Sequence, residues 1–101
     1  MSLQTLQLLQ VFMEDPAEPR YGLQLMERTR LKSGTIYPAL HRLESEGWLR
    51  SFSEDVDSSA VGRPARRLYA LTPTGHTAAE EALTPFRAAS APKPSAKARL
   101  A

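Results

Sequence analysis

The chain has 101 residues, 42% of them hydrophobic, with 13 basic and 11 acidic side chains and a formal net charge of +2, which allows one domain with a small core. The absence of cysteine excludes disulfides, thiolate catalysis and cysteine-bound metals, and no apolar run approaches the roughly 20 residues of a membrane span. We therefore expect a soluble cytoplasmic protein without a signal peptide or membrane contact, whose clustered arginines weakly indicate a polyanionic partner.

The first helix is predicted over residues 2 to 13, with Ser2 as its N-cap. Its apolar stripe repeats at helical spacing, and two further residues widen it: Leu3, Leu6, Leu9 and Met13, with Leu8 and Phe12 beside them. This arc is broad for a helix of so small a domain. The helix therefore either lies at the centre of the core or presents its excess to a second subunit.

A polar turn with two prolines, residues 14 to 20, separates this helix from a second one. The second helix is predicted over residues 21 to 29. We expect Leu23 and Met26 to point inward and Leu25 to lie at the margin. A short connector then leads to a third helix.

The third helix is predicted over residues 33 to 46, with Ser33 as its N-cap and Gly47 ending it. Its apolar stripe is expected to be buried: Ile36, Ala39, Leu40 and Leu43. Its opposite face carries hydrogen-bonding, aromatic and cationic groups: Thr35, Tyr37, Pro38, His41, Arg42 and Ser45. Two short helices followed by an amphipathic third one indicate a helix-turn-helix, and such an outer face suits the major groove of DNA.

Two strands are predicted over residues 48 to 53 and 66 to 71, from bulky side chains in the first and alternation in the second. The loop between them, residues 54 to 65, is polar and ends in Val61-Gly62-Arg63-Pro64-Ala65. A hairpin directly after a helix-turn-helix is a wing. Such a loop can lie on the phosphate backbone or place an arginine in the minor groove.

A last helix, residues 73 to 89, begins with proline at its first position and with Thr72 as its cap. Its apolar side is formed by Ala78, Ala79, Ala82, Leu83 and Phe86. We expect Pro85 to stop or kink this helix within a turn, and residues 90 to 101 to form a disordered basic tail. The chain thus divides into a winged helix-turn-helix over residues 1 to 72, a C-terminal dimerisation helix and the tail. The predicted fold is mainly α with one small β-hairpin.

Several motifs occur in order along the chain: Tyr21-Gly22-Leu23, Ser33-Gly34-Thr35-Ile36-Tyr37-Pro38-Ala39-Leu40-His41-Arg42-Leu43-Glu44, Gly47-Trp48-Leu49, Gly62-Arg63-Pro64, Arg67-Leu68-Tyr69 and Leu71-Thr72-Pro73-Thr74-Gly75. Over roughly residues 3 to 84 the chain therefore resembles the PadR family of bacterial transcriptional regulators, in its compact form with a short C-terminal helix. The resemblance implies a winged-helix fold, homodimerisation largely through the C-terminal helix, and repression at a palindromic operator. It also implies that a phenolic or drug-like effector is possible, since some members respond to such ligands.

The resemblance places the recognition helix at residues 33 to 46 and the wing at residues 54 to 67. The residues expected to contact double-stranded DNA are Lys32, Ser33, Gly34, Thr35, Tyr37, Pro38, His41, Arg42, Arg63 and Arg67. Successive strand side chains point to opposite faces, so only one of Arg66 and Arg67 can contact DNA. Of the two we favour Arg67. The residues expected at the dimer interface are Leu3, Leu6, Ala79, Leu83 and Phe86.

Some of these residues also have a simpler structural interpretation. Arg42 is the natural reader of guanine because its fork bonds two acceptors, but it can instead pair with Glu46 one turn further on. Thr35 can serve the helix terminus, and Tyr37 can pack its ring on the wing strands. Trp48 is expected in the core rather than stacked on a planar ligand.

Catalysis is not indicated. The two histidines fall in different elements, and neither a Ser-His-Asp arrangement nor metal-ligand spacing occurs. We expect no cofactor and no metal. Two alternatives to a DNA-binding repressor stay open at this point: a winged-helix module that binds another protein, and a small-molecule sensor.

Overall fold

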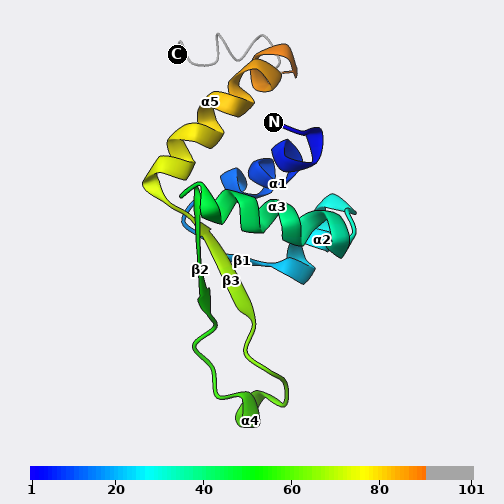
Figure 1. The fold of residues 1–101 in the computed structure, drawn as a ribbon, viewed down its shortest axis with the longest axis vertical. Helices are drawn as coiled ribbons and strands as arrows, with labels where there is room; N and C mark the ends of the chain where they lie inside the picture. The colour runs from blue at the N-terminus through cyan, green and yellow to red at the C-terminus, as the bar shows by residue number, and fades with distance from the viewer. Residues whose placement is uncertain (91–101) are drawn as a thin grey trace, which may run out of the picture.

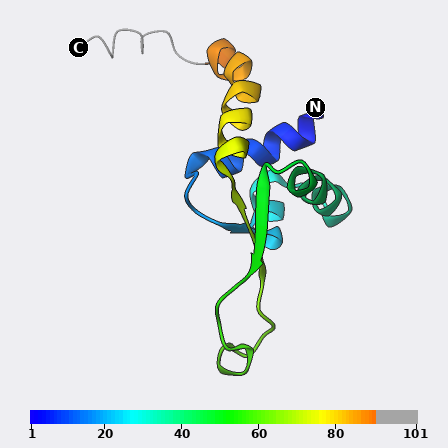
Figure 2. The same cartoon turned by 60° about the vertical axis from the view of Figure 1, so that its left-hand side comes forward.

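The structure, a computed structural model, describes residues 1–90, and it confirms the predicted winged helix-turn-helix (Figure 1). Its elements follow one another in this order: α1 (Leu3–Glu14), β1 (Arg20–Tyr21), α2 (Gly22–Thr29), α3 (Ser33–Ser45), β2 (Leu49–Ser53), α4 (Ser58–Val61), β3 (Arg67–Leu71) and α5 (Pro73–Ser90). The hairpin of β2 and β3 projects away from the helices and carries α4 at its far end, as both views show (Figures 1 and 2).

The sheet has three antiparallel strands in the order β1-β3-β2. The hairpin pairs Leu49 with Leu71 and Ser53 with Arg67, while β1 pairs Arg20 with Tyr69. The sequence did not predict β1, which is only two residues long. It forms where the buried Arg20 donates a hydrogen bond from Nη2 to the Val11 carbonyl at 3.2 Å, so that the chain after α1 is held beside β3.

The buried side of α1 differs from the predicted stripe. Leu8, Leu9 and Phe12 are at most 1% exposed, whereas Leu3 is 64% exposed and Leu6 and Met13 are only partly buried. The cause is that α1 contacts α2, α3 and α5 together, so its orientation is set by three partners. Ser2 caps the helix as predicted, because its Oγ accepts a hydrogen bond from the Thr5 amide at 3.1 Å.

The orientation of α2 was also predicted wrongly. Leu25 is fully buried and Leu23 is 52% exposed. The buried face of α2 runs through Gly22 and Leu25, one turn apart, because Gly22 lies directly beneath the side chain of Tyr37 on α3. A Cβ at Gly22 would lie 2.0 Å from the Tyr37 Oη.

The apolar stripe of α3 is buried as predicted, with Ile36, Ala39, Leu40 and Leu43 all at most 4% exposed. Gly47 has a φ of +81°, as expected for the residue that ends the helix. The predicted cap is one residue off: Lys32 is the N-cap, with no side-chain hydrogen bond, and Ser33 is already the first helical residue.

Thr72 joins the end of the wing to the end of the recognition helix. Its Oγ1 accepts from the Gly75 amide at 2.9 Å, which caps α5 as predicted, and donates to the Gly47 carbonyl at 2.6 Å. Its own amide donates to the Trp48 carbonyl at 3.0 Å. The start of α5 is thereby held against the junction between α3 and β2.

The last helix does not stop at Pro85 but continues to Ser90. Proline in a helix interior loses one backbone hydrogen bond, and α5 tolerates this loss because its earlier turns pack on α1 through the buried Ala79 and Leu83. Of the predicted tail, residues 90 to 101, Ser90 is the last residue of α5, and residues 91 to 101 lie outside the described residues.

We predict that Gly75→Ala destabilises the protein. A Cβ at Gly75 would lie 1.9 Å from the Trp48 carbonyl oxygen, so α5 would have to move away from the junction at a cost of about 1 to 3 kcal/mol. Thermal or urea unfolding measures this loss. Gly34→Ala is the matched control, because nothing lies within 4 Å of a Cβ there. A Gly75→Ala variant as stable as the control would contradict this view of the junction.

Candidate nucleic-acid interface

The outer face of α3 is exposed along the whole helix. Because successive helical residues are about 100° apart, Gly34, Pro38, His41 and Ser45 lie opposite the buried stripe, and all four are exposed. Thr35 and Arg42 lie on one flank of this face and Tyr37 on the other. We call the residues of this surface, from Lys32 to Ser45, the α3 outer face.

Tyr37 packs on the start of α2. Its ring lies over Gly22 at the start of α2, where the hydroxyl end covers the glycine. The side chain is still 45% exposed. The ring is therefore held in place by its own domain while part of it stays accessible at the edge of the α3 outer face.

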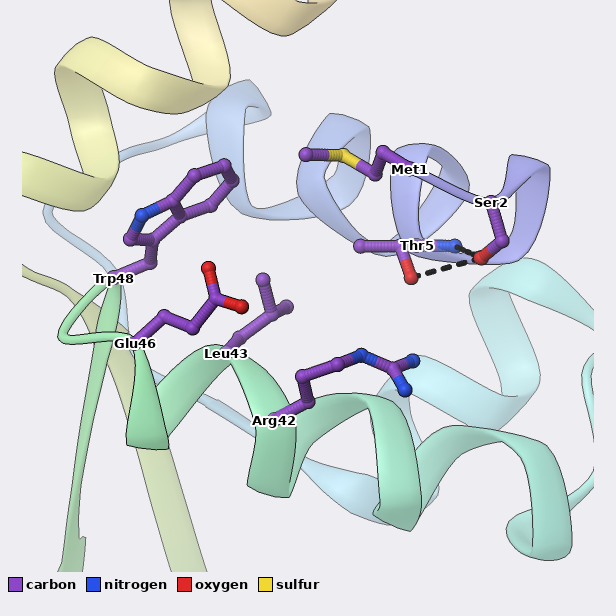
Figure 3. A pocket seen from close by; sticks show the side chains of 7 residues that line it. All are labelled: Met1, Ser2, Thr5, Arg42, Leu43, Glu46 and Trp48. Carbon is purple, nitrogen blue, oxygen red and sulfur yellow. Dashed lines mark hydrogen bonds between the residues drawn. The ribbon is translucent and has the colours of Figure 1, made fainter.

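Arg42 leans from its flank of α3 toward α1 and lines a cavity of about 480 Å³ (Figure 3). Among the described residues it makes no ion pair with Glu46, the alternative that the sequence left open. Trp48, at the other end of this cavity, is partly buried and packs against the core. Thr5 contributes to the α1 wall, where its hydroxyl is hydrogen-bonded to Ser2 at 2.9 Å.

Arg63 does not extend from the wing but folds back onto its stem. Its Nη1 lies 2.7 Å from Glu54 Oε1 and its Nη2 lies 3.3 Å from Glu54 Oε2. The same Oε1 accepts the Arg66 amide at 3.1 Å. The hydrogen bond from Arg63, followed by that from the Arg66 amide, holds the pKa of the Glu54 carboxyl below its usual range. The sequence did not predict this pair, because Glu54 and Arg63 come together only when the wing loop closes.

The two strand arginines separate as expected. Arg66 stacks on Tyr21, with 4.2 Å between its guanidinium carbon and the ring centroid. Arg67 is exposed and donates from Nη2 to the Ser51 Oγ at 2.8 Å. Ser51 in turn donates to Glu44 Oε2 on α3 at 2.5 Å. Arg67 is therefore the strand arginine tied to the recognition helix.

The predicted dimer residues fall into two groups. Ala79 and Leu83 are 0% and 4% exposed within the core of their own chain. Contrary to the prediction, their side chains are therefore not available to a second subunit. Leu3 and Phe86 are 64% and 53% exposed, and Leu6 is partly buried. The difference arises because α5 uses the face containing Ala79 to cover α1.

Among the described residues, no group of three or more histidine, aspartate or glutamate side chains could hold a metal ion. Within the same part of the chain, no helix is long and apolar enough to cross a membrane.

Comparisons with known proteins concern the family and the fold of the chain. The model of the transcriptional regulator PadR-like family matches residues 8–81. Over 52 residues the chain is 50% identical to the transcriptional regulator Rv3488 of Mycobacterium tuberculosis, a match that covers 52% of this chain and 44% of that relative. The chain therefore matches less than half the length of this curated relative.

Two solved structures share the fold. A PadR family transcription regulator from hypervirulent Clostridium difficile is 24% identical, with a TM-score of 0.70, and the match covers 85% of this chain and 88% of that one. BpsR of Bordetella bronchiseptica, whose DNA binding is regulated by 6-hydroxynicotinic acid, is 15% identical, with a TM-score of 0.67 over 99% of this chain and 74% of that one.

If the wing contacts DNA as the sequence predicts, Glu54→Gln should tighten binding. Glutamine keeps an oxygen for the Arg66 amide but removes the charge that holds Arg63, so this arginine becomes available to a phosphate. We expect the slope of log affinity against log salt to steepen by about 1, as measured by fluorescence anisotropy. Asp55→Asn is the control, because it removes the same charge from the same loop without touching the Arg63 pair. Equal effects of the two variants would show that Arg63 is not released onto DNA.

Proposed function

Because this chain belongs to the PadR-like family of transcriptional regulators, we propose that it is a homodimeric repressor that binds a palindromic operator. Each subunit places the α3 outer face in the major groove of one half-site and its wing on the flanking backbone or minor groove. Half-sites then lie about one helical turn apart, and the bound dimer excludes polymerase from the promoter. The observation that carries the proposal is the exposed α3 outer face, which the core presents next to the wing hairpin.

The chemistry of the α3 outer face supports entry by its N-terminal half. Gly34 has open space around it, and the first three turns carry no acidic residue. Lys32 and Ser33 stand at the helix N-terminus, where backbone amides also favour a phosphate. The acidic residue of α3, Glu44, lies in its last turn and is already bonded to Ser51. Repulsion between acidic side chains and the DNA phosphates is therefore weakest at the N-terminal half of α3, where the helix would enter the groove.

Within this arrangement His41 and Arg42 are the base readers. His41 lies in the middle of the α3 outer face. Arg42 lies on its flank, and its long side chain leaves the α1 side to bond guanine bidentately. Thr35, Tyr37 and Pro38 contact the backbone and sugar edges, and Arg67 does so from the wing.

We predict that Arg42→Ala and His41→Ala each relax sequence preference at one base position, at a cost of about 1 to 3 kcal/mol there. Lys32→Ala should instead weaken binding to all sequences alike and lower the salt slope by about 1. Selection from a random DNA pool, followed by anisotropy with a selected and an unselected duplex, measures both effects. An unchanged preference in both reader variants would refute the placement of α3 in the major groove.

The proposed dimer buries the apolar residues that the fold leaves exposed on its two packed terminal helices. Leu3 on α1 and Phe86 on α5 are both more than half exposed, and α1 and α5 contact each other. A second copy related by a two-fold axis would cover the same patch on both subunits. Ala79 and Leu83 support this interface from below by fixing α5 on α1.

We predict that Phe86→Glu shifts the protein from dimer to monomer, because a buried unpaired charge opposes association. Sedimentation should give twice 11.2 kDa for the wild type and 11.2 kDa for the variant. Leu23→Glu is the control, since Leu23 is similarly exposed at 52% but lies on α2. A monomeric wild type would refute the proposed dimer, and dissociation by the control variant alone would place the interface elsewhere.

A small-molecule effector is a second candidate property, supported by the cavity that Arg42 and Trp48 line. Its size suits a small ligand. A planar carboxylic acid there would stack on Trp48 and turn its carboxylate to Arg42, away from the Glu46 carboxylate that also lines the cavity. BpsR shows that a regulator with this fold responds to such a compound. Titration of the single tryptophan with 6-hydroxynicotinate tests it, and a signal that does not saturate would exclude this compound as the effector.

A further inference from the structure

Three polar side chains connect the recognition helix to both strands of the wing. Glu44 lies near the end of α3, Ser51 on β2 and Arg67 on β3. Arg67 is opposite Ser53 in the antiparallel register, and Ser51 shares a face of β2 with Ser53 because strand side chains alternate. Arg67 and Ser51 are therefore diagonal neighbours on one face of the sheet, on the side turned to α3.

The hydrogen bonds in this group can run in only one direction. A guanidinium only donates and a carboxylate only accepts. Ser51 must therefore give its proton to Glu44 and accept from Arg67, at 2.5 Å and 2.8 Å. Each bond polarises the next one, so the serine hydroxyl connects a cation on the wing to an anion on the helix.

Glu44 is partly buried, and its charge also affects its surroundings. Tyr69, which is paired with Ser51 in the sheet, has its pKa raised first by burial and then by the Glu44 carboxylate. The Glu44 carboxylate therefore lies close to both strands of the hairpin, where Ser51 on β2 donates a hydrogen bond to it.

We propose that Ser51, anchored by Glu44, is a positioning residue that holds the Arg67 guanidinium toward DNA and makes the wing and the recognition helix engage the duplex as one unit. The inference rests on the proposed DNA-binding function. Only Nη2 of Arg67 is used by Ser51, and the remaining donors of the guanidinium suffice for a phosphate. Ser51 itself needs no contact with DNA.

The test compares Arg67→Ala, Ser51→Ala, Ser51→Thr and the double variant Arg67→Ala/Ser51→Ala, using a duplex selected by the wild type and an unselected duplex of equal length. Arg67→Ala should weaken binding by about tenfold, as expected for one charged hydrogen bond, and lower the salt slope by about 1. Ser51→Ala should reproduce at least half of both changes. The double variant should bind no worse than Arg67→Ala, because the two residues act as a unit. Ser51→Thr keeps the hydroxyl and should bind like the wild type.

Ser53→Ala is the matched control, since Ser53 lies on the same face of the same strand and opposite Arg67. It should leave affinity and salt slope unchanged. Thermal unfolding of each variant separates positioning from simple stabilisation: a lower unfolding temperature in Ser51→Ala with an unchanged salt slope overturns the proposal. Additive losses in the double variant also overturn it.

Two further variants, Lys32→Ala and His41→Ala, measured on the same duplexes, separate failure of this inference from failure of the proposed DNA-binding function. If Arg67→Ala binds like the wild type while Lys32→Ala and His41→Ala lose affinity, the positioning role of Ser51 is wrong and DNA binding through α3 stands. If Arg67→Ala, Lys32→Ala and His41→Ala all bind DNA as the wild type does, the proposed DNA interface itself is wrong.

Discussion

Burial of one side of α3 is the constraint on which the rest of this structure depends. Ile36, Ala39, Leu40 and Leu43 are essentially inaccessible to solvent, and their removal from water fixes the rotation of the helix about its axis. With that rotation fixed, the residues between Lys32 and Ser45 that remain exposed can only form the outer face. The same helix is therefore both a wall of the core and, in the proposed function, the surface that enters the major groove.

The base of the hairpin is anchored in the core by the buried Leu49 and Ala70. Polar contacts fix the rest of the hairpin, because the part that projects from the domain has little to bury. Thr72 bonds the end of α3 to the start of α5, and Ser51 bonds β2 to Glu44. Further out, Glu54 holds Arg63 against the stem. Of these three contacts, the one made by Arg63 could be exchanged for a contact with a phosphate, whereas the bonds of Thr72 and Ser51 hold the hairpin in place.

The apolar stripe of α3 was predicted well, because one face of that helix is clearly apolar. The stripes of α1 and α2 were predicted less well, because the leucines of each helix lie on more than one side. For α1, contact with three other helices decided that Leu8 and not Leu3 is buried. The strand β1 and the helix α4 are shorter than any periodic signal, and the continuation of α5 past Pro85 depends on its packing against α1.

The sequence by itself determined the order of the four longer helices and the two hairpin strands, the outward-facing residues of α3 and, through its motifs, the PadR-like family, because these are properties of short stretches and their spacing. Only the tertiary structure decided which cations are engaged and by what. Arg63 meets Glu54 and Arg67 meets Ser51 across loops and strands, and Arg42 leans toward α1. Hydrogen bonds depend on distances of tenths of an ångström between residues far apart in the chain, and sequence spacing carries no information at that scale.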